Sequence, residues 1–155
     1  RNQQRPCRTC SAIRRTTMAE FGVQAGEFSI SVRVYYEDTD AGGIVYYANY
    51  LRFMERARSD WLRSRGVDAT RLRDEHSLML VVARAQIDYK VPARLDDELQ
   101  VSVAVERIRR VSIELAQQVR RGTELLASAA VRVGCISAPE CRPRPFPSSV
   151  LGALR

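Results

Sequence analysis

Hydrophobic and polar residues alternate along five stretches of the chain, a period that predicts β-strands with one buried face. The first stretch covers residues 28–36, and the others begin near residues 78, 99, 111 and 125. Because the connections after residue 78 are short, we expect the last four strands to form an antiparallel meander. In the stretch that starts at residue 78, the alternation puts five residues on one face: Val81, Ala83, Ala85, Ile87 and Tyr89.

Between residues 47 and 65 the period changes to that of an amphipathic helix, which Gly66 ends. The apolar stripe of a single helix has to be buried, and one face of the sheet is the surface available to it. The sequence therefore predicts an α+β fold, a five-stranded antiparallel sheet around one long central helix. A shorter helix is expected over 148–154. The helical stripe consists of Tyr47, Tyr50, Met54, Ala57 and Trp61.

The charge of the chain is concentrated in its two ends. The 155 residues carry a formal net charge of +7, and residues 1–17 contain five arginines and no acid. Residues 18–137 contain equal numbers of basic and acidic residues. A basic protein can bind nucleic acid, but the neutral body argues against such a partner. No apolar run reaches the length of a membrane span, so we expect none.

The two ends are set apart from the predicted domain of residues 18–147. Residues 1–17 show no period and are interpreted as a disordered or non-native extension, with Cys7 and Cys10 as thiols of a loose tail rather than half of a zinc site. Residues 148–155 are assigned to a C-terminal tail. No secretory signal is visible, so a cytoplasmic location is expected. No metal and no cofactor are predicted.

Candidate chemistry lies just before the predicted helix. Glu37, Asp38 and Asp40 are followed by Gly42 and Gly43, which allow the backbone to approach a ligand closely. The free N–H groups of a helix N-terminus can stabilise the developing charge of a carbonyl oxygen, and a carboxylate nearby can attack the carbonyl carbon or activate water. Taken alone, such a segment is more often an N-cap and a tight turn. We assign Asp38 that structural role.

The stretch VYYEDTDAGGIVYYAN (34–49), with ERAR at 55–58, closely resembles the hotdog-fold acyl-CoA thioesterases. Within the 4-hydroxybenzoyl-CoA thioesterase family, it is most similar to the thioesterases encoded with the bacterial Tol–Pal system, and the similarity covers about residues 28–147. The resemblance implies a hotdog fold, assembly as a homotetramer built as a dimer of dimers, and hydrolysis of a short-chain or aromatic acyl-CoA to free acid and CoA. It makes Asp40 the nucleophile or general base.

The same resemblance implies the remaining site residues. The backbone N–H of Tyr47 and its neighbours would polarise the carbonyl, and the preceding residues Gly43, Ile44 and Val45 would contact the substrate. Tyr47 stands where the Tol–Pal type usually has His, which leaves open a non-catalytic acyl-binding or envelope-associated module on the same fold. Arg109 and Arg110 are candidates for the phosphates of CoA, with an ordinary solvated turn as the alternative.

Overall fold

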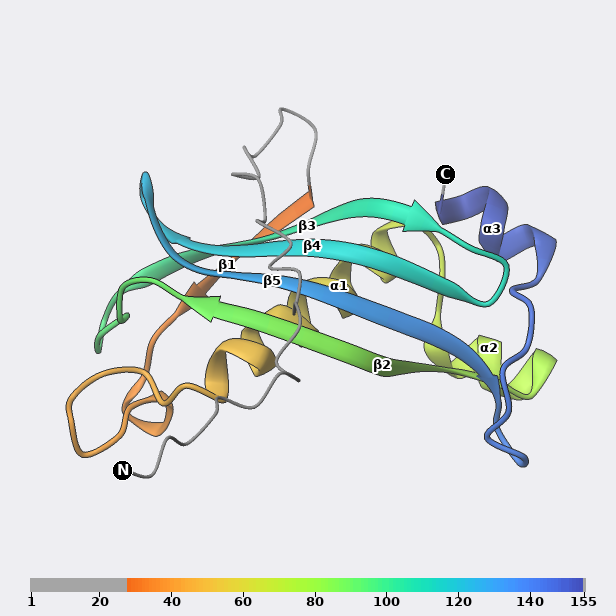
Figure 1. The fold of residues 1–155 in the computed structure, drawn as a ribbon, viewed down its shortest axis with the longest axis horizontal. Helices are drawn as coiled ribbons and strands as arrows, with labels where there is room; N and C mark the ends of the chain where they lie inside the picture. The colour runs from red at the N-terminus through yellow and green to blue at the C-terminus, as the bar shows by residue number, and fades with distance from the viewer. Residues whose placement is uncertain (1–27, 155) are drawn as a thin grey trace, which may run out of the picture.

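The computed structural model describes residues 28–154, which form one five-stranded antiparallel sheet and its helices (Figure 1). The predictions for residues 1–17, including Cys7 and Cys10, lie outside this range. The strands stand in the order β1-β3-β4-β5-β2. The elements are β1 (Phe28–Arg33), the 3₁₀ helix η1 (Tyr36–Asp38), α1 (Asn49–Ser64), α2 (Ala69–His76), β2 (Leu78–Tyr89), β3 (Glu98–Ile108), β4 (Ser112–Arg121), β5 (Glu124–Ser137) and α3 (Ser148–Leu154).

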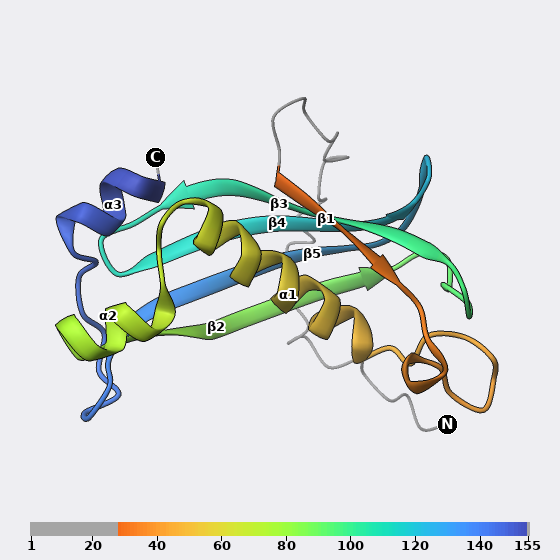
Figure 2. The same cartoon turned by 180° about the vertical axis from the view of Figure 1, so that it is seen from behind.

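Helix α1 crosses one face of the sheet, and the sheet curves around it (Figure 2). The helix is confirmed, and Tyr50, Met54, Ala57 and Trp61 of the predicted stripe are buried against the sheet. Tyr47, the fifth residue of that stripe, lies before the helix and is largely exposed. The helix begins at Asn49, two residues later than predicted, because the N–H of Asn49 donates to the carbonyl of Tyr46 in a tighter turn. Phe53 and Met54 at the centre of the helix are fully buried.

The predicted meander is correct for β3, β4 and β5 and wrong for β2. Strand β3 already has β1 on one edge and β4 on the other, so β2 has no free edge there and pairs with β5 instead. The segment between β2 and β3 therefore crosses from one side of the sheet towards the other. As a consequence, β2 is an edge strand with one open side among the described residues.

A bulge at Ala83 divides the predicted face of β2: Ala85, Ile87 and Tyr89 share one side as predicted, whereas Val81 does not. Val82 pairs with Val133 and Ala85 pairs with Val131, so Val82 and Ala85 point to the same side, the side that α1 covers. Val81, next to Val82, consequently points to the opposite side. The extra residue of a bulge shifts the alternation by one, which is why a strict period of two cannot describe the whole strand.

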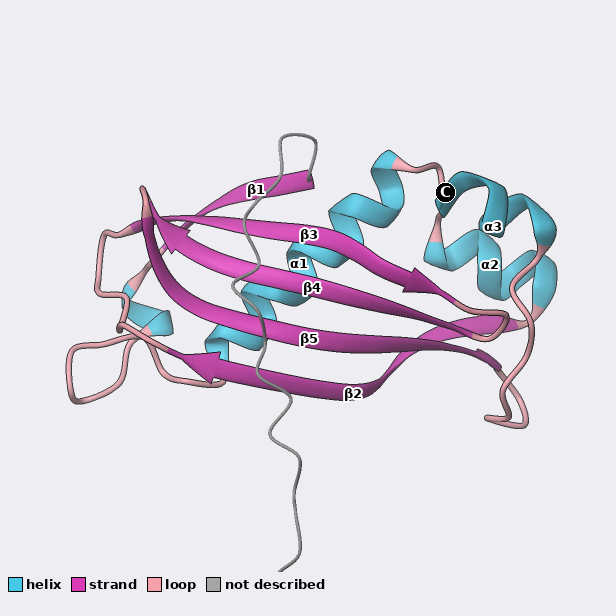
Figure 3. Cartoon of the chain, turned by 45° about the horizontal axis from the view of Figure 1, so that its top comes forward, coloured by secondary structure: helices cyan, strands magenta, loops and turns pink. Residues whose placement is uncertain are grey.

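The two short helices lie together at one end of the sheet (Figure 3). Helix α3 confirms the short helix expected there, and its Val150 and Leu154 are part of the hydrophobic core. The residues expected as a C-terminal tail thus pack with the body of the domain through residue 154. Within residues 28–154, no helix combines the length and the apolar composition needed to cross a membrane.

Asp68 starts α2, and its carboxylate accepts hydrogen bonds from the N–H groups of Arg71 and Thr70 at 3.0 and 2.7 Å. These bonds, the one from Arg71 most of all, lower the pKa of Asp68 below its ordinary value of 3.8. Its stabilising contribution is therefore complete at neutral pH and is lost as the pH falls through the folded-state pKa. We expect Asp68→Ala to lower the Tm at neutral pH, with a difference from wild type that shrinks in acid.

Circular dichroism melts over a range of pH check this prediction. Asp74→Ala, an exposed change on the same helix, is the matched control. A difference in Tm between Asp68→Ala and the wild type that stayed constant down to the acid limit of folding would contradict the assigned cap.

Candidate functional site

The acidic segment forms a narrow loop between β1 and α1. Thr39 and Val45 are bridged across its base, the N–H of Asp40 donates to the carbonyl of Ile44, and the N–H of Gly43 donates to the carbonyl of Asp40. Gly43 has φ of 69°, in the left-handed region that glycine adopts without strain, and a side chain there would meet no other atom within 4 Å. Gly43 is therefore required by the turn rather than by close approach to a ligand.

The carboxylate of Asp40 is exposed and fixed at one oxygen only. Its Oδ1 accepts the N–H of Gly42 at 2.8 Å, and a Cβ on Gly42 would lie 3.1 Å from this same oxygen. The glycine thus makes room for the aspartate side chain. The second carboxylate oxygen has no hydrogen-bond partner among residues 28–154, so it is free to act on a substrate.

Asp38 joins this loop to the start of α1. Its buried carboxylate accepts the N–H of Tyr35 at 2.9 Å, and its carbonyl accepts both the N–H of Tyr46 and the side-chain amide of Asn49, the latter at 3.0 Å. The structural role predicted for Asp38 is confirmed. Because Asn49 is the first residue of α1, the bond from its side chain holds the loop at the tip of the helix.

The helix tip offers unpaired donors. No carbonyl or side chain of the described residues accepts the N–H of Tyr47 or of Ala48. The hydroxyl of Tyr89, at the end of β2, donates to the carbonyl of Tyr47 at 2.9 Å. In a planar trans peptide the C=O and N–H point in opposite directions, so this bond also sets the direction of the Ala48 N–H.

Aromatic rings surround the same place. The ring of Tyr47 is 61% exposed and lies 4.7 Å from that of Tyr46 and 6.4 Å from that of Tyr89, measured between centroids. The pKa of Tyr46 is raised above its ordinary value, chiefly by a hydrogen bond with Tyr47, and the negative charge of Asp40 adds to the rise. Tyr46, Tyr47 and Tyr89 thus form a cluster of rings beside the helix tip.

The other predicted substrate contacts differ in their placement. Ile44 is half-buried in the loop, whereas the side chain of Val45 is only 3% exposed and its N–H donates to the carbonyl of Ala93. Both groups of Val45 are thus committed to the fold, and the structure does not support a substrate contact by this residue within one chain.

Arg109 and Arg110 are not brought to the loop of their own chain. They lie in the turn between β3 and β4, at the end of the sheet opposite the loop (Figure 1). The eleven residues of β3 separate the two ends by about 33 Å. Arg109 pairs with Glu114 at 3.2 Å. Arg94, which is exposed and follows Ala93, is a basic residue that the same chain does hold beside the loop.

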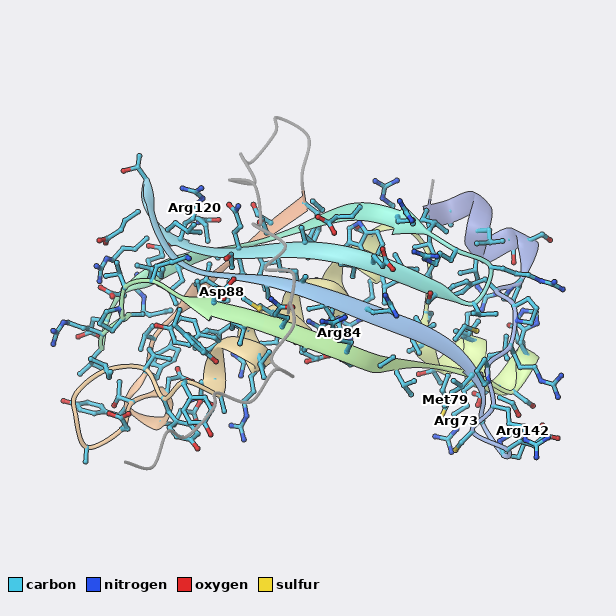
Figure 4. All side chains as sticks on the ribbon, in the orientation of Figure 1. Arg73, Met79, Arg84, Asp88, Arg120 and Arg142 are labelled. Carbon is cyan, nitrogen blue, oxygen red and sulfur yellow. The ribbon has the colours of Figure 1, made fainter. Side chains whose placement is uncertain are left out.

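The outer face of the sheet contributes little to this site, and the described residues offer no metal-binding cluster. Arg84 lies midway along β2 (Figure 4), on the face turned away from α1. No group of three or more His, Cys, Asp or Glu side chains that could hold a metal ion exists among residues 28–154.

Sequence reasoning missed Tyr89 and Asn49 as parts of the site. Tyr89 lies on the helix-facing side of β2, and its bond to Tyr47 joins residues 42 positions apart. Asn49, the first residue of α1, entered the sequence analysis only as the last residue of the stretch 34–49. Neither contact has a signature in the local pattern.

Comparison with known proteins assigns the class. The model of the thioesterase-like superfamily matches residues 34–154, and the chain belongs to this family. The match begins immediately after β1 and includes the whole Asp40 loop.

Curated relatives make the assignment more specific. The chain is 44% identical over 127 residues to the acyl-CoA thioesterase YbgC of Haemophilus influenzae, covering 82% of this chain and 93% of the relative. It is 39% identical over 129 residues to the acyl-CoA thioester hydrolase YbgC of Escherichia coli O6:H1, covering 83% and 96%. The protein is a thioester hydrolase.

Solved structures confirm the hotdog fold. A probable thioesterase from Bartonella henselae is 33% identical with a TM-score of 0.74, covering 78% of this chain and 99% of that one. A 1,4-dihydroxy-2-naphthoyl-CoA thioesterase from Synechocystis is 27% identical with a TM-score of 0.76, covering 83% and 96%. The predicted α+β hotdog fold is correct.

Proposed function

We propose that this protein hydrolyses the thioester of a short-chain or aromatic acyl-CoA to the free acid and CoA, with Asp40 as the reacting carboxylate. The observation that carries the proposal is the exposed carboxylate of Asp40, of which only Oδ1 accepts a hydrogen bond. The bond from the side chain of Asn49 to the carbonyl of Asp38 holds the loop with this carboxylate at the tip of α1. The cytoplasmic location stays a prediction.

The unpaired N–H groups at the helix tip suit the thioester oxygen. As the carbonyl carbon becomes tetrahedral, its oxygen gains negative charge, which the N–H groups of Tyr47 and Ala48 would stabilise together with the positive end of the helix dipole. The ring of Tyr47 is not needed for this task, so the tyrosine in place of histidine leaves the donor intact.

Two routes use the free oxygen of Asp40. As a nucleophile, it bonds to the carbonyl carbon, the C–S bond breaks, CoA leaves as the thiolate, and water then hydrolyses the mixed anhydride. As a general base, it takes a proton from a water molecule whose oxygen attacks the carbonyl carbon, and the thiolate leaves in the same way. Both routes end with free acid, CoA and an unchanged enzyme.

Assembly through the open edge of β2 would complete the site. Antiparallel pairing of two copies of β2 about a two-fold axis sets the loop end of each copy beside the opposite end of the other. The turn containing Arg109 and Arg110 lies at that opposite end. We therefore propose a dimer in which each loop receives these arginines from the other copy, as contacts for the phosphates of CoA, and a dimer of dimers as the full assembly.

A substrate panel tests the proposed function. Purified protein is assayed by thiol release with acyl-CoAs that vary in length and aromatic character, and with the same acyl groups on acyl carrier protein. Turnover of CoA thioesters supports the proposal. Saturable binding without release of thiol would instead favour the alternative of a non-catalytic acyl-binding module.

Tyr89→Phe tests whether the Tyr47 peptide has to be held in place. The change keeps the ring and removes only the hydroxyl bonded to the carbonyl of Tyr47. Losing an oxyanion donor costs about a hundredfold or more; here the donor remains but is less well oriented, so we expect kcat to fall roughly tenfold with KM nearly unchanged. Tyr36→Phe, at a ring that is 81% exposed, is the control. An unchanged kcat in Tyr89→Phe would show that the bond is only structural.

A further inference from the structure

Tyr50, the second residue of α1, has a buried hydroxyl that joins the helix to a distant segment. The residue is 3% exposed, and its Oη accepts the N–H of Ala93 at 2.8 Å. Ala93 lies between β2 and β3 and is itself fully buried. Because a buried N–H without an acceptor is costly, this bond fixes the place of Ala93 against the helix.

The carbonyl of Ala93 continues the connection to the Asp40 loop. It accepts the N–H of Val45 at 2.9 Å, and Val45 is bridged to Thr39 across the base of that loop. Ala93 therefore lies between the helix and the loop, with its donor bound to one and its acceptor bound to the other. Along this route, two hydrogen bonds join α1 to the base of the loop that carries Asp40.

The segment that contains Ala93 is attached to the sheet as well. Just before Ala93, the N–H groups of Lys90 and Val91 donate to the carbonyl of Leu126 in β5, at 2.8 and 3.2 Å. The hydroxyl therefore connects the helix to a segment whose position is already set by the sheet. Without that bond, the segment and the helix could shift relative to each other.

Tyr50 is too deeply buried to touch a substrate. Its ring packs against those of Tyr89 and Phe53, at 5.5 and 6.3 Å between centroids. The pKa of its hydroxyl is raised above the ordinary value of 10.0, chiefly by burial, so the group stays neutral near pH 7 and does not serve as an acid or base. Any effect of this hydroxyl on turnover has to pass through the backbone that it holds.

We infer that Tyr50 is a positioning residue for hydrolysis, and that its hydroxyl, through Ala93, fixes the Asp40 loop relative to the tip of α1. The inference rests on the proposed function, in which the carboxylate and the helix N–H groups act on the same carbonyl. The side chain of Asn49 already holds the loop at Asp38. A single attachment leaves a loop free to swing, whereas the second one, through Ala93, also fixes its orientation.

Tyr50→Phe tests the inference, because it keeps the ring and removes only the acceptor of the Ala93 N–H. A displacement of about 1 Å can cost about a hundredfold in rate, so we expect kcat to fall roughly ten- to a hundredfold with KM nearly unchanged. Tyr36→Phe, the same change at an exposed ring, should alter neither. Gln117→Met, which removes buried hydrogen bonds beneath the middle of the same helix, should lower the Tm and leave kcat unchanged.

A double-mutant cycle with Asp40→Asn separates positioning from loss of stability. If the hydroxyl acts by placing the Asp40 carboxylate, Tyr50→Phe should cost little further activity once that carboxylate is gone, so the double variant should match Asp40→Asn within about threefold. An equal loss in both backgrounds, or an unchanged kcat in Tyr50→Phe alone, would overturn the inference and leave the proposed function standing. Full activity of Asp40→Asn would overturn the proposed function with it.

Hydrogen exchange keeps the test decisive if Tyr50→Phe does not fold. In the wild-type protein the amide of Ala93 should exchange as slowly as the amides of the core strands, although Ala93 lies outside any helix or strand. Exchange as fast as that of Ala41, in the exposed part of the Asp40 loop, would show that the hydroxyl does not hold Ala93 in place. That result would overturn the inference without reference to any variant.

Discussion

Replacing Asp40 by asparagine is expected to lower kcat for thioester hydrolysis by about two to four orders of magnitude. Asparagine keeps the size of the side chain and an oxygen that can accept the N–H of Gly42, so the loop should keep its shape. It cannot take a proton from water, and its amide oxygen is a poor nucleophile at the thioester carbon. The measurement is steady-state thiol release with the best substrate of the panel.

The asparagine variant needs a control that separates charge from position. Asp74→Asn makes the same change at an exposed aspartate of α2 and should retain full activity. The Tm of Asp40→Asn should stay close to that of the wild type, because Oδ1 of Asp40 bonds only within its own loop. A variant at Asp40 with a third or more of the wild-type kcat would rule out this carboxylate as the reacting group.

Replacing Val82 by lysine is expected to convert the assembled protein into monomers and to lower activity about a hundredfold. Val82 is 51% exposed on the helix-facing side of the open edge strand, and charged side chains, lysine above all, prevent pairing of sheet edges. In a two-fold pair the lysine would occur twice in one interface. Activity should fall because small displacements of reacting groups can cost about a hundredfold.

Sedimentation velocity and thiol release are measured together for this variant. Val105→Lys, at an exposed valine of the interior strand β3, is the matched control and should remain assembled and active. A wild-type protein that sediments as a monomer would contradict assembly through β2. Monomeric Val82→Lys with full activity would show that the Asp40 loop works without a second copy.

Local patterns predicted the elements of this fold well. Strand β2 occupies the stretch from residue 78 to Tyr89, and α1 buries the predicted stripe from Tyr50 to Trp61, because burial of one face imposes a period that the chain itself displays. The loop was found in the same way, since its acids and glycines are consecutive. Asp38 received its structural role from turn chemistry alone.

Contacts between distant segments could not be predicted from local patterns. The position of β2 at the edge depends on which strand has a free side, and the Ala83 bulge depends on pairing with β5. Arg109 and Arg110 were chosen by resemblance, which does not show that they lie far from Asp40 within one chain. Arg58 was part of a quoted motif, but its burial against Gln117 appears only when the helix meets the sheet.

The strand order also governs when the sheet can be completed during synthesis. Strand β2 emerges from the ribosome well before β5, yet among the strands of residues 28–154 only β5 pairs with it. Until β5 has been synthesised, residues 78–89 lack the strand that satisfies their backbone groups, and such a delayed long-range pairing is slow and leaves the segment exposed to aggregation. Truncation before residue 124 would therefore leave β2 unpaired on both sides and prone to aggregation.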